Sequence, residues 1–154
     1  MQVSKGTPNL HEETVSGFGD EWSAFDQTGM PPEETQRQFD IYFGDFPWAA
    51  LPVNAEGFDL GCGSGRWAAL VAPRVGRLHC IDASEAALNV ARQRLGDVAN
   101  VDFHHASVDA IPLADGSQDF GYSLGVLHHV PDTAAGLTDC VAKLKPGEIG
   151  RAHV

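Results

Sequence analysis

The sequence predicts an α/β fold in which helices flank a parallel sheet. From about residue 57 onward, short apolar runs alternate with helical patterns, which is typical of parallel strands joined by helices. The length of 154 residues suits one domain, and 43% hydrophobic and 20% charged residues is the balance of an ordinary globular protein. We therefore expect one sheet-based domain, preceded by an N-terminal extension.

The first 56 residues predict two parts in front of the sheet. Residues 1–20 are expected to form a flexible leader, and residues 21–56 a helical extension that mixes aromatic with acidic residues. Pro32 followed by two glutamates suits a helix start, because negative charge is favourable at the positive end of the helix dipole. We expect the aromatic residues to dock the extension onto the sheet, while Trp22 or Tyr42 could instead cover a bound substrate. These residues are Trp22, Phe25, Phe39, Tyr42, Phe43 and Trp48.

Four apolar runs predict the strands, at about residues 57–61, 77–82, 101–106 and 119–125. Two helical patterns follow the second and fourth runs. The first is expected to begin after Ser84 as N-cap and to end at Gly96. The second is expected to begin after Asp132 and to end at Pro146 and Gly147.

The last seven residues, EIGRAHV, are what a widely used sequencing-library adapter gives when it is translated in one reading frame. We therefore expect residues 148–154 to be a non-native tail and the native part to end near Gly147. The strand–helix pattern also stops after the helix that follows the fourth strand. The core, residues 57–147, is accordingly expected to be incomplete and truncated at its C-terminal end.

Charge and cysteine content limit the classes of partner. The net charge is −11 and the ten Lys and Arg residues are scattered, which disfavours nucleic acid and favours a small molecule. No apolar run has the length of a membrane span or the character of a secretory signal, so a cytoplasmic protein is expected. Cys62, Cys80 and Cys140 are far apart, so we expect reduced thiols and neither a metal site nor a disulfide.

A glycine-rich turn follows the first predicted strand. Gly61, Gly63 and Gly65 would let the backbone approach a ligand closely, although tight turns also use glycine for their own geometry. Asp82 lies 17 residues beyond Gly65, at the end of the second strand, where a carboxylate can accept hydrogen bonds from both hydroxyls of a ribose. The two features together predict a nucleoside-type ligand.

Two ligands of this type fit the turn. The run from Gly63 to Ala68 has the Gly-x-Gly-x-x-Ala form used for a dinucleotide, which would make the protein an NAD(P)-dependent oxidoreductase. Asp59, two residues before Gly61, favours a different ligand. A carboxylate beside a pyrophosphate adds negative charge to negative charge, whereas it suits an ammonium and a sulfonium. S-adenosyl-L-methionine carries both of these cationic groups.

Four segments, FDLGCGSGRWA, LHCIDASEAALNVAR, IPLADGSQDFGYSLGVLHHVPD and LKPG, occur in this order. Together they resemble the class I S-adenosylmethionine-dependent methyltransferases, in the small-molecule branch that includes the ubiquinone/menaquinone-biosynthesis-like enzymes. The resemblance covers about residues 57–147. It implies a Rossmann-like sheet of seven strands, of which this chain would hold the first four, and methyl transfer to a small-molecule acceptor. A non-catalytic cofactor-binding fragment remains an alternative.

The resemblance also implies a role for individual residues. Asp59 and the backbone of residues 61–65 would meet the methionine part of the cofactor, and Asp82 the ribose. Ser107 stands where many relatives carry an acidic residue that binds the adenine amino group, which is a departure from the family pattern. The implied cofactor-binding residues are Asp59, Gly61, Cys62, Gly63, Gly65, Asp82, Ala83, Ser107, Val108, Leu124 and Gly125.

His128 and His129 follow the fourth predicted strand, near where the methyl group would point. Either histidine could act as a general base if the acceptor has to lose a proton. Both could instead orient the loop or pack against the next helix, and the sequence does not distinguish between the two histidines.

Overall fold

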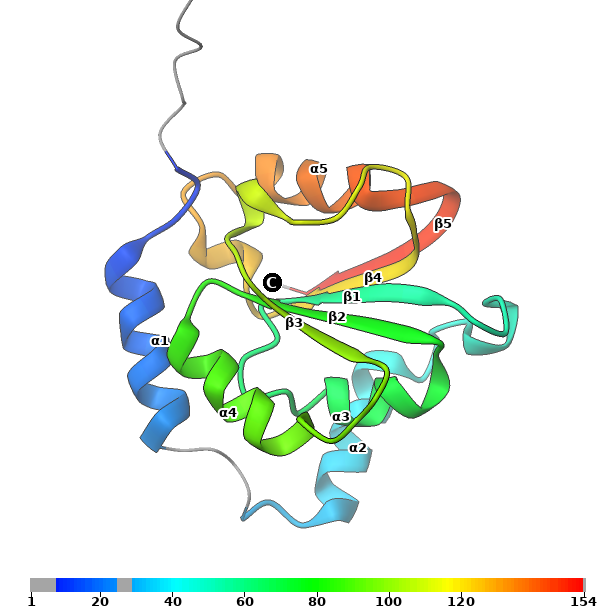
Figure 1. Ribbon diagram of the computed structural model, residues 1–154, viewed down its shortest axis with the longest axis horizontal. Helices are drawn as coiled ribbons and strands as arrows, with labels where there is room; N and C mark the ends of the chain where they lie inside the picture. The colour runs from blue at the N-terminus through cyan, green and yellow to red at the C-terminus, as the bar shows by residue number, and fades with distance from the viewer. Residues whose placement is uncertain (1–7, 25–28, 154) are drawn as a thin grey trace, which may run out of the picture.

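The computed structural model describes residues 8–24 and 29–153. Its five strands form one parallel sheet in the order β3-β2-β1-β4-β5 (Figure 1). Their bounds are β1 Glu56–Leu60, β2 Arg77–Asp82, β3 Val101–His105, β4 Gln118–Leu124 and β5 Leu144–His153. The α/β class is confirmed, and each of the four predicted strands lies within one residue of its expected bounds.

The fifth strand was not predicted, so the expectation that the chain holds only the first four strands is wrong. β5 pairs in parallel with the outer edge of β4, for example Leu124 with His153. A register shift between Gln118 and Phe120 separates the pairing at Leu144 from the pairing that resumes at Ile149. Such pairing uses backbone groups, which an edge strand offers to any extended segment. That residues 148–154 are non-native therefore stays a prediction.

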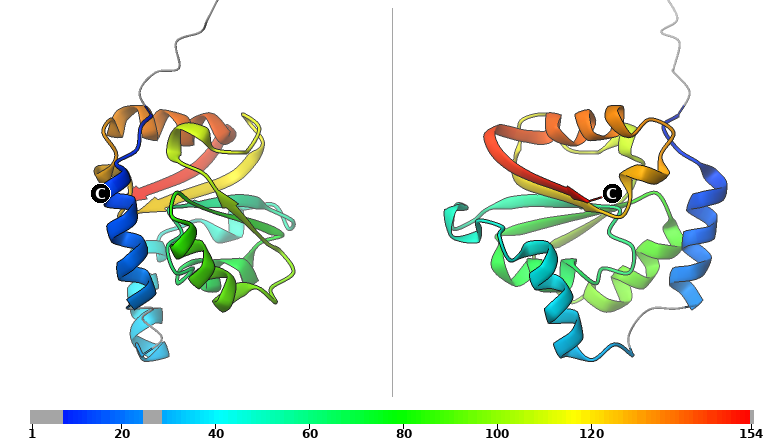
Figure 2. Two further views of the ribbon diagram at one scale, coloured as in Figure 1. Left: turned by 60° about the vertical axis from the view of Figure 1, so that its left-hand side comes forward. Right: turned by 180° about the vertical axis from the view of Figure 1, so that it is seen from behind.

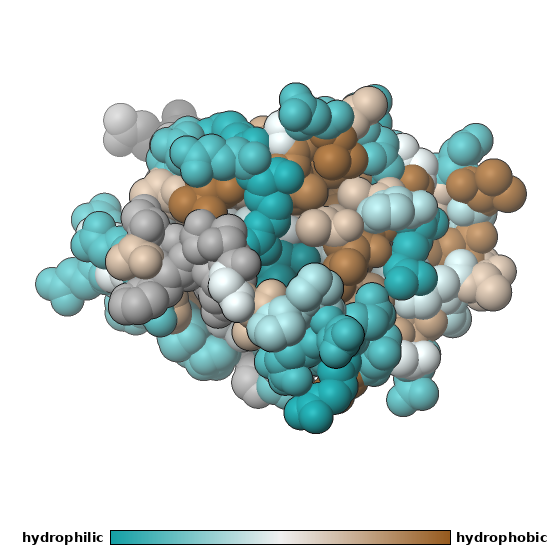
Figure 3. Space-filling view, turned by 90° about the horizontal axis from the view of Figure 1, so that it is seen from below, coloured by the Kyte–Doolittle hydropathy of each residue, from teal (hydrophilic) through white to brown (hydrophobic). Residues whose placement is uncertain are grey.

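Helices cover both faces of the sheet (Figure 1). α2 (Pro32–Phe43), α3 (Ala68–Val71) and α4 (Glu85–Leu95) lie on one face, and α5 (Thr133–Lys143) lies on the other. The predicted N-caps are confirmed, because Ser84 Oγ accepts a hydrogen bond from the amide of Ala87 and Asp132 Oδ1 accepts one from the amide of Ala135. The side of the molecule that carries α2, α3 and α4 is seen from below in Figure 3. Its surface mixes hydrophilic residues with smaller hydrophobic areas.

The aromatic residues of the extension are part of the larger of two cores. Phe39 and Phe43 of α2 are buried, and the ring of Phe43 meets that of Tyr122 edge-on at 5.0 Å between centroids. Tyr42 and Trp48 are partly buried against the same core, so docking is confirmed for these four residues of the extension. The side chain of Trp22 and the whole of Phe25 lie outside the part of the chain that the structure describes.

Two glycine–phenylalanine pairs hold the centre of the sheet together. Gly57 of β1 stands opposite Phe120 of β4, and Phe58 stands opposite Gly121. A Cβ atom added to Gly57 or to Gly121 would come within 2.3 Å of the facing ring. Each glycine thus leaves room for an aromatic ring of the neighbouring strand, which keeps β1 and β4 in close contact beneath the loops at their ends.

The N-terminal segment is a helix rather than a flexible leader. α1 (Glu12–Ala24) lies beside α4 at the end of the sheet where the strands terminate (Figures 1 and 2). Gly17 and Gly19 lower its intrinsic helix propensity, which is why the sequence did not predict it. Gly19 is buried, and a Cβ atom there would lie 2.6 Å from Ser84 Oγ, so close packing on the start of α4 places the helix. Residues 1–7 of the predicted leader lie outside the described part.

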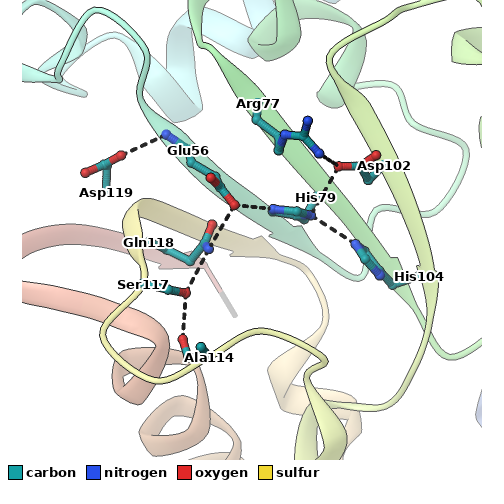
Figure 4. A network of polar contacts seen from close by, with 9 residues as sticks. All are labelled: Glu56, Arg77, His79, Asp102, His104, Ala114, Ser117, Gln118 and Asp119. Atoms are coloured by element: carbon teal, nitrogen blue, oxygen red, sulfur yellow. Dashed lines mark hydrogen bonds and ion pairs between the residues drawn. The ribbon is translucent and has the colours of Figure 1, made fainter.

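A polar network joins β1, β2 and β3 away from the carboxyl ends of the strands (Figure 4). His79 is only 7% exposed, and its two ring nitrogens lie 2.7 Å from Glu56 Oε1 and 3.0 Å from His104 Nε2. Arg77 donates a hydrogen bond of 2.6 Å to Asp102 at the exposed side of the same network. The hydrogen bond from His79 lowers the pKa of Glu56. The buried histidine is thus satisfied by groups of the sheet itself.

Candidate functional site

A cavity of about 150 Å³ lies where β1, β2, β3 and β4 end. The strand order places β2 and β3 on one side of β1 and β4 on the other, so the chain reverses direction across the sheet at β1 and β4. Ligands of parallel α/β sheets bind at the carboxyl ends of the strands next to such a reversal. The cavity therefore occupies the place where this architecture provides a ligand site.

The structure brings most of the sequence-predicted residues together around this cavity. They come from the segments that follow four different strands, which the chain order alone keeps far apart. The predicted residues that line the cavity are Gly61, Gly63, Asp82, Ala83, Ser107, Val108, Leu124, Gly125 and His129.

Four predicted residues do not line it. Cys62 is buried in the core, where the contact with Cys80, together with burial, raises the pKa of its thiol. Gly65 faces α4, and a Cβ atom there would lie 2.9 Å from Leu95 Cδ1. Asp59 is buried at the end of β1, just before the glycine loop, and the ring of His128 lies against that of His129 at 3.8 Å between centroids, tilted by 43°. Any role of these residues toward a ligand would be indirect in the arrangement described.

The backbone of the glycine loop is fixed from two sides. The amides of Gly61 and Cys62 both donate to the carbonyl of Ile81, at 2.7 and 3.1 Å. Gly61 has a φ of +75°, and a Cβ atom on it would lie 2.2 Å from Val126 Cγ2. Glycine is required there for both reasons, since other residues rarely adopt this backbone conformation. The loop consequently presents bare main chain to the cavity.

Asp82 connects the glycine loop to the start of α4. Its Oδ2 accepts a hydrogen bond of 2.9 Å from the amide of Gly63, and its Oδ1 accepts one of 2.8 Å from the amide of Ser84. Burial raises the pKa of Asp82, and these backbone hydrogen bonds partly offset the rise. The carboxylate is thereby held at the tip of β2 and lines the cavity.

Asp59 is a buried acid without an obvious charge partner. It is 2% exposed, and neither its Oδ2 nor the hydroxyl of Tyr122 has a hydrogen-bond partner among the described residues. Burial raises the pKa of Asp59 to about 7; nearby Tyr122 partly offsets this effect and the Asp82 carboxylate adds to it. A buried polar atom in this state is costly and is typical of a site whose ligand completes it.

Ser107 lies on the wall formed after β3, and its hydroxyl donates a hydrogen bond to Asp109 Oδ1. This bond lowers the pKa of Asp109. Ser107 stands where the resembled family carries an acidic residue, and Asp109, which was not predicted as a site residue, supplies a carboxylate beside it. The signal was present in the sequence as an acid two residues further on.

The N-terminal segment, residues 8–24, supplies the outer wall of the cavity and was missed entirely. Its contribution includes Thr14, Val15 and Phe18. The ring of Phe18 meets His129 edge-on at 4.9 Å between centroids. Burial, together with neighbouring His128, lowers the pKa of His129. No motif marks this segment, so only its folded position identifies it.

Within the described ranges, 8–24 and 29–153, the His, Cys, Asp and Glu side chains form no group of three or more that could hold a metal ion. No helix of these residues has the length and apolar character needed to cross a membrane. The candidate site thus consists of a bare backbone loop, buried carboxylates and a largely apolar outer wall.

Comparison with known proteins gives a family for this arrangement. Residues 58–150 match the family model described as a methyltransferase domain. A stretch of 91 residues is 36% identical to the ubiquinone biosynthesis O-methyltransferase of Aromatoleum aromaticum, and it makes up 58% of this chain and 39% of that protein. The chain therefore spans well under half the length of this curated relative.

Solved structures share the fold at low sequence identity. Phosphoethanolamine N-methyltransferase 1 of Haemonchus contortus, solved with phosphoethanolamine and S-adenosylhomocysteine, has a TM-score of 0.73 at 13% identity, covering 94% of this chain and 32% of that one. The [4+2]-cyclase SpnF has a TM-score of 0.64 at 22% identity, covering 75% and 43%. The second is named for a different reaction, so this likeness shows the fold alone.

Proposed function

The chain belongs to the methyltransferase domain family, and from that membership we propose that it binds S-adenosyl-L-methionine and transfers the methyl group to a small-molecule acceptor. One observation carries this proposal. The bare glycine loop and the Asp82 carboxylate meet at one edge of the cavity, joined by the hydrogen bond from the amide of Gly63. Backbone and carboxylate together suit an adenosyl group, whose ribose offers two hydroxyls.

The residues around the cavity fit this cofactor. Asp82 would accept hydrogen bonds from the ribose, and Ala83 and Val108 would lie against the adenine, with Ser107 near its amino group. Leu124 and Gly125 would line the methionine part. Asp59 would stabilise the cationic groups from the end of β1, since its carboxylate has an oxygen without a partner in the described structure.

The cofactor supplies a methyl group already activated by a sulfonium. The task of the protein is therefore to align the acceptor and exclude water. Phe18, Val126 and Val130 provide an apolar wall on the acceptor side, and His129 is the one predicted base that lines the cavity. This combination supports an apolar acceptor that carries a hydroxyl, which also agrees with the O-methyltransferase name of the relative.

The cysteines and the net charge support a cellular location and a class of partner. The three cysteines are free and buried, which supports a reducing, cytoplasmic compartment. The net charge of −11 supports a small molecule rather than nucleic acid as the partner.

Thermal unfolding tests the proposed function without knowledge of the acceptor. S-adenosylhomocysteine at 100 times its dissociation constant is expected to raise the midpoint by about 5–10 °C, because such saturation contributes about 2.7 kcal/mol and each kcal/mol shifts a domain of this size by about 2–4 °C. NADH at the same concentration is expected to have no effect. A shift with NADH alone would support the oxidoreductase instead, and no shift with either ligand would contradict both.

Substitution of His129 tests the base. His129→Gln is expected to lower kcat for a phenolic acceptor by about 100-fold or more, since a positioned base contributes about 10²–10⁴. The affinity for S-adenosylhomocysteine is expected to stay unchanged. His128→Gln is the matched control, because His128 does not line the cavity. An equal decrease of kcat in the two variants, measured with a labelled methyl donor, would exclude a specific role for His129.

A further inference from the structure

The contacts of Asn9 anchor the N-terminal segment across the mouth of the cavity. Its Nδ2 donates to the carbonyl of Asp132 at 2.8 Å, and its Oδ1 accepts from the amide of Asp132 at 2.7 Å. Its own amide donates to Asp109 Oδ2 at 3.0 Å. One residue thus joins the segment to the turn after β3 and to the turn that begins α5, and residues next to both turns line the cavity.

Apart from the Asn9 contacts and the close approach of Gly19 to Ser84, the packing of the segment is modest. Thr14, Val15 and Phe18 are only partly buried, and Gly19 is the one fully buried residue among the α1 positions whose burial the structure describes. No α1 residue belongs to either core of the described chain. Elements with few buried apolar contacts open at low free energy, and binding-site lids are drawn from such elements.

The cavity beneath the segment is small for a nucleoside cofactor. Its volume is about 150 Å³, whereas pockets for ligands of drug size run from about 300 to 1,000 Å³. The inner walls are strand ends and the fixed glycine loop, which have little freedom to move. Outward movement of the segment would widen the cavity for a ligand, and the Asn9 contacts break when the segment moves.

We propose that Asn9 is a positioning residue that closes residues 8–24 over the cavity, so that breaking its contacts sets the rate at which the adenosyl cofactor enters and leaves. This inference rests on the proposed function for the identity of the ligand. The neutral amide matters, because it offers a donor and an acceptor to the main chain of Asp132, while the backbone amide of Asn9 bonds the Asp109 carboxylate. A carboxylate at position 9 would lose the donor and add negative charge near Asp109.

Two variants of the full chain test the proposal. Asn9→Ala and Asn9→Asp are expected to increase amide hydrogen exchange in residues 12–24 by about tenfold or more, because two side-chain hydrogen bonds are lost or weakened in each. The rates of binding and release of S-adenosylhomocysteine, measured by stopped flow, are expected to rise together, so that the dissociation constant changes less than threefold. Gln36→Ala is the control, since it removes an exposed amide that donates a hydrogen bond to Asp40 within α2, away from the cavity.

The outcomes separate this inference from the proposed function. Exchange in residues 12–24 that matches the parent in both variants would overturn the role of Asn9. Faster exchange with unchanged rates of ligand binding and release would overturn it as well, because Asn9 would then only stabilise the helix. If the parent binds no S-adenosylhomocysteine, the proposed function and the control of cofactor exchange both fail, while the exchange data still decide whether Asn9 closes the segment.

Discussion

The variant Asp82→Ala is expected to bind S-adenosylhomocysteine about 100-fold more weakly than the parent, or worse. Hydrogen bonds to a charged group contribute about 1.5–3 kcal/mol each, two ribose hydroxyls would be lost, and every 1.4 kcal/mol is a factor of ten. The substitution also releases the amide of Gly63, which the carboxylate holds at 2.9 Å. Titration calorimetry at neutral pH measures the change.

An exposed acid in the turn after α4 gives the control for charge. Asp97→Ala removes the same side chain from a residue that does not line the cavity, and its affinity is expected to match the parent. Asp82→Asn removes the charge but keeps the shape of the side chain. Its affinity for S-adenosylhomocysteine is expected to lie between those of the parent and the alanine variant. An Asp82→Ala protein that is folded and binds the ligand as tightly as the parent would remove the ribose role.

The variant Asp59→Asn is expected to be more stable than the parent by about 4 kcal/mol at pH 8 without ligand. The pKa of Asp59 rises from 3.8 to about 7 on folding, so the folded state binds this proton more tightly than the unfolded state does. The resulting stabilisation is complete below about pH 4 and is lost as the pH rises through 7. Each pKa unit corresponds to about 1.36 kcal/mol, and asparagine avoids the cost because it carries no charge.

Urea unfolding at pH 4 and pH 8 measures this difference, which is expected to be small at the lower pH. Asp119→Asn is the matched control, because Asp119 is also buried but accepts hydrogen bonds from the amide of Glu56 and from Lys145. The pKa of Asp119 is lowered, so its removal is expected to destabilise the protein at pH 8. An Asp59→Asn variant that is less stable than the parent at pH 8 would contradict an uncompensated buried charge.

The sheet was predictable where local pattern and burial agree. Three of the four predicted strands, β1, β2 and β4, are mostly buried runs. Ser84 and Asp132 begin helices through local side-chain hydrogen bonds, which residue type and spacing mark in the sequence. β5 escaped prediction because it takes its place by pairing with β4, and Lys-Pro-Gly looks locally like an end. α1 escaped because Gly19 is favourable only when α4 lies against it.

The candidate site likewise contains residues that the sequence predicts and residues that only the fold reveals. The glycine loop and Asp82 are marked by residue type and spacing, so the sequence places them together. Asn9 and Phe18 carry no such mark, since their positions depend on how residues 8–24 cross the strand ends. His128 and His129 are neighbours of the same type, and only the folded loop shows that His129 lines the cavity.

Calorimetric titration of the protein with S-adenosyl-L-methionine tests most directly whether the glycine loop and Asp82 hold this donor. We predict binding of one molecule per chain with a micromolar dissociation constant, and loss of the measurable heat in Asp82→Ala. The absence of heat with both S-adenosyl-L-methionine and S-adenosylhomocysteine, from a protein shown to be folded, would contradict the assignment.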